Sequence, residues 1–296
     1  MKCGFVSIVG RPNVGKSTLL NTILGMKLAI TSNVSGTTRN IINGIYNDEE
    51  SQIIFVDTPG IHKPNDKLGN LLNKKAYNNT EGVDIILFLV DISKGFGKGD
   101  RFILERLKDK KVPIYLLLNK IDLVKNKEDL LKDIDTLQKE YEFKEIIPIS
   151  AKKNNNVEDL IKCIKRDLPE MDKIYSEEEL TNVTTRFIMA EFVREKVLEL
   201  THDEIPHTVT CYTENYEEDD KVVHIQVLIV VDRDNIKKII IGKQGSMLKE
   251  IGTRARQDME EFLGKKVFLE TYVKTLKNWR DQERYFVELG LKDEDE

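Results

Sequence analysis

The chain has 296 residues, of which 40% are hydrophobic and 33% are charged, a composition typical of a soluble globular protein rather than a disordered one. Two domains of ordinary size would account for this length. The net charge of −5 at pH 7 argues against a protein that binds nucleic acid over its whole surface, but it allows a local basic face. The three cysteines lie far apart, without histidines at ligand spacing, so we expect neither a disulfide framework nor a zinc site. The absence of a signal-type segment and of any run of about 18 apolar residues favours a cytoplasmic protein.

Short apolar runs alternate with segments of helical spacing in the first half of the chain. These runs are nearly continuous in their apolar character, as in strands that are covered on both faces. The predicted strands are 5–10, 52–57, 83–91, 112–120 and 145–150, with an extra edge strand at 40–46 beside 52–57. The predicted helices are 15–24, 66–78, 98–110, 127–140 and 156–167. The alternation predicts an α/β domain with a mostly parallel sheet and helices on both faces.

The alternation stops near Pro169, where a cluster of acidic residues interrupts both periods. The remaining pattern predicts a helix, two strands, two helices and a strand, an order typical of a smaller α+β domain. Their ranges are 186–200, 208–213, 222–231, 234–241, 246–262 and 267–274, followed by a last helix at 278–289. The predicted limits are 1–172 for the first domain, 173–185 for a linker, 186–290 for the second domain and 291–296 for an acidic tail.

The stretch "GRPNVGKS" lies between the first predicted strand and the first predicted helix and matches the G-x-x-x-x-G-K-S/T pattern of a phosphate-binding loop. Its glycines allow the backbone to wrap an anion with N–H groups at a helix N-terminus. Lys16 would contact the β- and γ-phosphates, and the Ser17 hydroxyl would be a ligand of Mg²⁺. The residues of this loop predicted to bind a nucleotide are Gly10, Asn13, Val14, Gly15, Lys16, Ser17 and Thr18.

The stretch "DTPG" follows the strand at 52–57 and is predicted to complete the phosphate and metal site. Asp57 is placed to hold Mg²⁺, usually through a water, and the Gly60 N–H to contact the γ-phosphate. Thr58 and Pro59 lie between these two residues. A threonine on a flexible segment is also needed, and we expect Thr38 of "SGTTRN", with Thr37 as the alternative. That segment would order with GTP and loosen with GDP.

The stretches "NKID" and "SAK" follow the strands at 112–120 and 145–150 and predict a preference for guanine. The Asp122 carboxylate matches the paired N1–H and N2–H₂ donors of guanine, whereas adenine would leave this acceptor unpaired. Asn119 would brace the loop, and Lys120 would lie along the base. The Ala151 N–H could reach the guanine O6. Ser150 and Lys152 complete this predicted part of the site.

With these motifs in order, the chain resembles the bacterial Era-type GTPases, in which a GTPase domain precedes a C-terminal type II KH domain that binds RNA. The resemblance covers nearly the whole chain and includes "GRPNVGKSTLLN", "DTPGIHKP", "LLLNKID", "FIMAEFVREKVLEL" and "IIIGKQGSMLKEIGTRARQDME". It implies Mg²⁺-dependent hydrolysis of GTP to GDP, with Lys16, Thr38 and Gly60 as the catalytic residues. It also implies binding to small-subunit ribosomal RNA near its 3′ end and a role in assembly of the small ribosomal subunit. We further expect a monomer, with peripheral contact with the inner membrane as a possibility.

Three residues near the phosphate site bear on the mechanism of hydrolysis. Ile61 follows "DTPG" where Ras-like enzymes carry the glutamine that orients the attacking water, so we expect slow turnover. Asn13 stands where some related GTPases bind K⁺, although a turn-stabilising side chain is an equally good interpretation. His62 is better interpreted as a solvated switch residue than as a catalytic base.

A second glycine loop, "GKQG" at residues 242–245, lies between two predicted helices and has the G-x-x-G pattern of a KH domain. Such loops clamp about four nucleotides of single-stranded nucleic acid. Residues 221–280 contain thirteen Lys or Arg against seven Asp or Glu, a surplus of six within an acidic chain. We therefore expect an RNA-binding surface on and around this loop. The predicted residues are Lys237, Lys238, Ile241, Gly242, Lys243, Gln244, Gly245, Ser246, Lys249, Arg254 and Arg256.

Two functional hypotheses follow from these motifs. In the first, the nucleotide state gates binding of RNA or the ribosome through the second domain. In the second, the protein is an RNA-binding assembly module in which GTP is a structural ligand and hydrolysis is incidental. Ile61 keeps the second hypothesis open, and "NKID" makes an ATPase a distant third.

Overall fold

The computed structural model describes residues 1–296 except 33, 35–36, 62–65, 204, 290 and 292–296. The chain divides into two compact units. The first contains Met1–Leu28, Thr38–Lys63 and Leu72–Asn182, and the second contains Ala29–Thr37, Pro64–Leu71 and Val183–Glu296. Two short segments from the first part of the sequence, 29–37 and 64–71, thus belong to the second unit. The assignment of these two segments depends on contacts between residues far apart in the sequence, and the predicted limits at 172 and 186 stay predictions.

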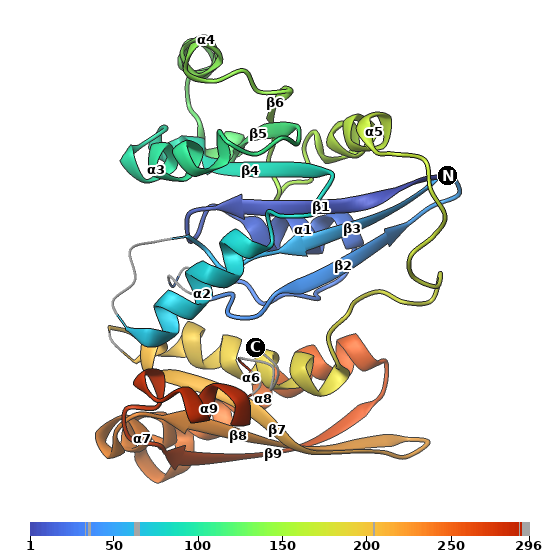
Figure 1. The fold of residues 1–296 in the computed structure, drawn as a ribbon. Helices are drawn as coiled ribbons and strands as arrows, with labels where there is room; N and C mark the ends of the chain where they lie inside the picture. The colour runs from blue at the N-terminus through green and yellow to red at the C-terminus, as the bar shows by residue number, and fades with distance from the viewer. Residues whose placement is uncertain (33, 35–36, 62–65, 204, 290, 292–296) are drawn as a thin grey trace. The chain divides into compact units, whose positions relative to one another are not determined.

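The first unit is built on a six-stranded sheet in the order β2-β3-β1-β4-β5-β6 (Figure 1). All neighbouring strands are parallel except β2 and β3, which are antiparallel. The strands are β1 (Lys2–Gly10), β2 (Ile42–Asn47), β3 (Ser51–Asp57), β4 (Ile85–Asp91), β5 (Ile114–Asn119) and β6 (Glu145–Pro148). Every residue of β3, β4 and β5 is buried, as the continuous apolar runs predicted. The mostly parallel sheet and the edge position of β2 are confirmed.

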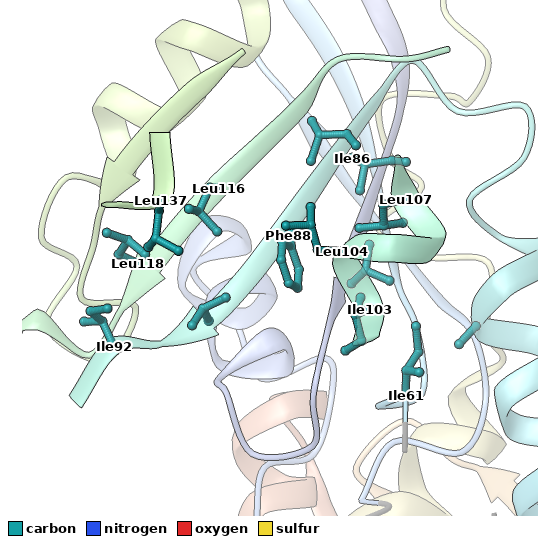
Figure 2. Packing of buried hydrophobic residues seen from close by; sticks show 14 of the residues in the cluster. Ile61, Ile86, Phe88, Ile92, Ile103, Leu104, Leu107, Leu116, Leu118 and Leu137 are labelled. Carbon is teal, nitrogen blue, oxygen red and sulfur yellow. The ribbon is translucent and has the colours of Figure 1, made fainter. Parts of the chain in front are cut away.

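Helices cover both faces of this sheet, because successive side chains of each strand point to opposite faces. On one face Ile103, Leu104 and Leu107 of α3 pack with Phe88 and other buried residues of the central strands (Figure 2). On the other face the Tyr115 hydroxyl of β5 donates 2.6 Å to a carboxylate oxygen of Asp167, the last residue of α5. The helices of this part of the chain are α1 (Lys16–Leu24), α2 (Lys67–Asn78), α3 (Lys98–Leu107), α4 (Lys127–Glu140) and α5 (Val157–Asp167).

The main body of the second unit has a three-stranded sheet in the order β7-β8-β9, with β7 antiparallel and β9 parallel to the central β8. Its elements are α6 (Thr185–Leu200), β7 (Val209–Glu218), β8 (Val222–Val231), α7 (Asp234–Ile241), α8 (Ser246–Leu263), β9 (Lys266–Thr275) and α9 (Glu283–Glu288). The predicted order of elements, and with it the α+β class, is confirmed.

Two predicted elements of this unit were wrong in extent. Strand β7 continues past the predicted end at 213 to Glu218, because pairing with β8 resumes after an irregularity between Thr213 and Asn215. The predicted helix 278–289 is a 3-10 turn at Trp279–Asp281 followed by α9, with Gln282 between them in an extended conformation. Among the described residues, none of the helices combines the length and apolar character needed to cross a membrane.

Candidate nucleotide and nucleic-acid sites

The loop at residues 10–17 has the backbone conformation that a phosphate-binding loop requires. Asn13 and Gly15 adopt positive φ angles of 63° and 105°, and α1 begins directly afterwards at Lys16. A Cβ on Gly10 would lie 2.4 Å from the Leu89 carbonyl oxygen, and a Cβ on Gly15 would lie 2.4 Å from Asn119 Nδ2. Larger residues would therefore displace the neighbouring strand ends. The glycines let the loop approach them closely at the N-terminus of α1, where backbone N–H groups favour an anion.

Lys16 is buried beneath this loop. Its Nζ donates to the carbonyl oxygens of Gly10 at 3.3 Å and Arg11 at 3.1 Å. Burial lowers the pKa of Lys16 to about 8, and the nearby Asp57 carboxylate opposes part of this decrease. A bound phosphate would supply the missing negative charge and favour the ammonium form. The position of Lys16 is thus suited to a polyphosphate ligand.

Three side chains that carry oxygen atoms, those of Ser17, Thr38 and Asp57, lie close to Lys16 and could bind a metal ion. Ser17 Oγ donates 2.7 Å to Asp57 Oδ2 and lies 3.0 Å from Thr38 Oγ1. Asp57 Oδ1 is buried and has no hydrogen-bond partner among the described residues. Burial raises the pKa of Asp57 to about 6, with Lys16 and Ser17 opposing the increase. Hydroxyl and carboxylate oxygens are ligands that Mg²⁺ accepts, and a hydrated cation would satisfy the buried Oδ1, so the residues fit a magnesium site.

The two candidate threonines differ in their contacts. Thr38 supplies the hydroxyl beside Ser17, whereas Thr37 Oγ1 donates 2.6 Å to the Val34 carbonyl oxygen. The side chain of Thr37 thus stabilises its own segment. This geometry favours Thr38 as the metal ligand.

The turn after β3 packs tightly on the phosphate loop. Thr58 Oγ1 donates 2.9 Å to the Ile8 carbonyl oxygen, and Pro59 is buried beside it. A Cβ on Gly60 would approach Pro12 to 2.9 Å, so the Gly60 backbone lies close against the loop. Ile61 is 2% exposed and belongs to the buried cluster of Figure 2, where it cannot orient a water. His62 lies outside the described residues.

The predicted base-binding loops are joined by Asn119, which is 2% exposed at the end of β5. Its Nδ2 donates 2.7 Å to the Val14 carbonyl oxygen, and its Oδ1 accepts from the Ala151 N–H at 2.9 Å. Asn119 therefore braces both loops. The Ala151 N–H, which was predicted to contact guanine O6, donates to Asn119 Oδ1 in this structure. Its contact with guanine stays a prediction.

Asp122, the predicted recognition residue, is exposed and oriented by Ser150. The Ser150 hydroxyl donates 2.6 Å to Asp122 Oδ1, so the carboxylate is held while its other oxygen is left for a ligand. Thr18 lies half-buried in the first turn of α1, and Lys152 is exposed after Ala151. The structure thus brings the predicted base-site residues to the carboxyl ends of β5 and β6.

Asp91 is a part of the site that the sequence analysis missed. It ends β4 directly opposite Asn119 in the parallel register and is 2% exposed. Lys120 Nζ donates 2.7 Å to Asp91 Oδ2 and 2.8 Å to the Asn13 carbonyl oxygen. Burial alone would raise the pKa of Asp91, but the hydrogen bonds from Lys120 and Ser93 together outweigh it and hold the pKa below its usual range. The sequence did carry a signal for Asp91: it is an acidic residue at the end of the predicted strand 83–91, and the next predicted strand ends in "NKID".

The second glycine loop also requires its glycines. Gly242 has a φ of 72°, and a Cβ there would lie 2.7 Å from Met247 Cβ. Gln244 and Gly245 follow with φ angles of 53° and 79°. Three of the four loop residues thus have positive φ angles, and the loop exposes Lys243 and Gln244 between α7 and α8.

The predicted RNA-binding residues around this loop are not equivalent. Arg254 Nε lies 2.7 Å from Glu250 and Arg256 Nη1 lies 2.8 Å from Glu260, so both pair with acids of α8. In the described part of the chain no acid lies within ion-pair distance of the other four predicted cations, which are Lys237, Lys238, Lys243 and Lys249. Ile241 and Ser246 border the loop at the end of α7 and the start of α8. The four lysines are the better candidates for phosphate contacts.

Comparison with known proteins agrees with this geometry. Residues 5–120 match the family model described as "50S ribosome-binding GTPase", and residues 204–280 match that of the KH domain. The chain is similar to a solved Era structure from Aquifex aeolicus bound to GDP·AlF₄⁻, at 42% identity and a TM-score of 0.95. It is also similar to Era in complex with MgGDPNP and nucleotides 1506–1542 of 16S ribosomal RNA, at 41% identity and a TM-score of 0.95. Both alignments cover 98% of this chain and 99% of the other.

The fold and the site together define a GTPase joined to a KH domain. The predicted guanine-nucleotide class and the KH assignment are confirmed. Identity of this degree over nearly the whole length shows more than a shared fold. The chain belongs to the Era family.

Proposed function

We propose that this protein binds GTP with Mg²⁺ in the site around Lys16 and hydrolyses it slowly. The observation that carries this assignment is that Ser17 Oγ lies within hydrogen-bond distance of both Thr38 and Asp57, with Asp57 Oδ1 buried and unsatisfied among the described residues. The complex of an Era protein with MgGDPNP supports the choice of metal. When bound, Mg²⁺ supplies positive charge that offsets the charge developing on the phosphates.

The residues of the chain have separate roles in this mechanism. Lys16 neutralises charge on the β- and γ-phosphates, and the N–H groups of the loop hold the phosphates in line. The Gly60 N–H contacts the γ-phosphate, a role supported by the close packing of Gly60 on Pro12 of the phosphate loop. Asp122 selects guanine, while Asn119 fixes the base loop to the phosphate loop. Ile61 occupies the position of the water-orienting glutamine of Ras-like enzymes, and it is buried and apolar, so it cannot orient the attacking water. Basal hydrolysis is therefore slow.

We further propose that the KH domain binds single-stranded ribosomal RNA of the small subunit near its 3′ end, and that the protein acts in small-subunit assembly. Support comes from the exposed "GKQG" loop, from the four lysines on and next to the flanking helices, and from the complex of a related Era protein with a 16S ribosomal RNA fragment. Glycines permit close approach of the sugar-phosphate backbone, and lysines add a salt-dependent attraction.

The alternative function, an RNA-binding module with GTP as a structural ligand, is favoured by one observation, the burial of Ile61 at the position of the water-orienting residue. Single-turnover cleavage of GTP, measured with and without an RNA of the 3′ end of 16S ribosomal RNA, separates the two functions. A switch predicts that RNA accelerates cleavage or that GTP and GDP change RNA affinity. Equal rates and equal affinities would favour the structural role.

Three subsidiary proposals concern ions and location. K⁺ near Asn13 would add positive charge beside the phosphates, and equal turnover in KCl and NaCl would contradict it. The protein is proposed to be a cytoplasmic monomer. Peripheral association with the inner membrane is proposed as an additional location, and flotation with inner-membrane vesicles tests it.

A further inference from the structure

Helix α6 buries four charged residues in the second unit. Glu191, Arg194, Glu195 and Lys196 are 8%, 1%, 1% and 7% exposed. Burying a charge is costly unless it is paired and hydrogen-bonded, so each of these side chains needs partners in the structure. Their partners include backbone groups of segment 29–37.

Arg194 forms a two-pronged ion pair with Glu191 and reaches one further group. Its Nε and Nη2 each lie 2.6 Å from a carboxylate oxygen of Glu191. Nη2 also donates a hydrogen bond to the Thr37 carbonyl oxygen. The planar guanidinium supplies these donors in a fixed geometry that a lysine ammonium does not reproduce.

A second contact holds the other end of the same segment. The Thr31 N–H donates 2.8 Å to Glu195 Oε1. Lys196 Nζ lies 3.1 Å from Glu195 Oε2 and 2.9 Å from Asp258 Oδ2 of α8, the helix that follows the "GKQG" loop. Segment 29–37 is thus fastened to α6 near both of its ends, within a charge network that extends to α8.

We propose that Arg194 is a positioning residue for GTP hydrolysis, an inference that rests on the proposed role of Thr38 as a magnesium ligand. The peptide bond between Thr37 and Thr38 is planar, so a fixed Thr37 carbonyl restricts the orientation of the next residue. Thr38 carries the hydroxyl that lies 3.0 Å from Ser17 Oγ. Arg194 therefore helps to orient Thr38, the proposed metal ligand, through the peptide bond that Thr38 shares with Thr37.

The test compares full-length wild type with Arg194→Met, Arg194→Lys and Glu191→Gln. We would measure the Kd values of GDP and of a non-hydrolysable GTP analogue, and the Mg²⁺ concentration that gives half-maximal single-turnover cleavage. Arg194→Met should weaken binding of the analogue about tenfold and raise the Mg²⁺ midpoint similarly, the size of a typical coupling between sites, with GDP affinity within twofold of wild type. Arg194→Lys should recover part of the loss, and Glu191→Gln should shift both quantities in the same direction by less.

Lys196→Met is the matched control: it removes another buried α6 cation that reaches the segment only at Thr31, through Glu195, and it leaves the contact with the Thr37 carbonyl intact. Its thermal stability should fall, while the ratio of GDP to analogue affinity stays at the wild-type value. Folded Arg194→Met with wild-type affinities and Mg²⁺ midpoint would overturn the inference, as would an equal loss in Lys196→Met. If Arg194→Met does not fold, unchanged values in Glu191→Gln have the same consequence. A wild-type protein that fails to cleave GTP would instead contradict the proposed function itself.

Discussion

Replacing Asn119 with alanine tests whether one buried amide holds the nucleotide site together. The substitution removes the hydrogen bonds to the Val14 carbonyl and from the Ala151 N–H, both of which are buried. A buried polar group left unsatisfied costs about 1–3 kcal/mol, so two such groups amount to about 2–6 kcal/mol. In the free protein the loops can separate and let water reach these groups. Bound nucleotide would close the loops, so most of the cost should fall on the bound state.

The lower limit of about 2 kcal/mol corresponds to an increase in Kd of roughly 30-fold. We would titrate wild type and Asn119→Ala with a fluorescent GDP and measure thermal unfolding of both. Asn126→Ala serves as the control, because Asn126 caps α4 by accepting 3.0 Å from the Glu128 N–H on the exposed surface. The control should lose about 1 kcal/mol of stability and no nucleotide affinity. Folded Asn119→Ala with wild-type affinity for GDP would refute the bracing role.

Three further predictions concern the base, the phosphates and the RNA loop. Asp122→Asn should move preference from GTP towards xanthosine triphosphate, because the amide offers a donor to the oxygen that replaces the guanine amino group; competition titrations that still favour GTP at wild-type affinity would show that the base lies elsewhere. Lys16→Ala should nearly abolish single-turnover cleavage by removing a charge-assisted phosphate contact, and unchanged turnover would contradict the phosphate assignment. The double change Lys243→Asp and Gln244→Asp should weaken binding of single-stranded RNA at least roughly tenfold and flatten its salt dependence, while GDP affinity measured without RNA stays the same. A folded double variant with the wild-type RNA affinity and salt slope would show that this loop is a turn without a role in RNA binding.

The nucleotide loops could be predicted because their chemistry is local. Gly10 is required by its close approach to the Leu89 carbonyl and Gly15 by its positive φ, and Lys16 and Ser17 follow at the start of a helix. Strand and helix positions were predicted for a similar reason, since continuous apolar runs identify strands buried on both faces. The end of the chain was harder to predict. Asn278 adopts a left-handed conformation before Trp279, and the predicted helix is broken at Gln282.

The sequence by itself determined the order of the elements, the two glycine loops and the polar residues that follow the strands, because periodicity and backbone conformation depend on near neighbours. Only the tertiary structure decided which of these residues meet. The parallel register of β4 and β5 sets Asp91 beside Asn119, and Asn119 joins loops 105 and 32 residues away. The Thr37 carbonyl is held by Arg194 from 157 residues away. Such contacts join segments with no shared local pattern, so their partners become visible only when the chain is folded.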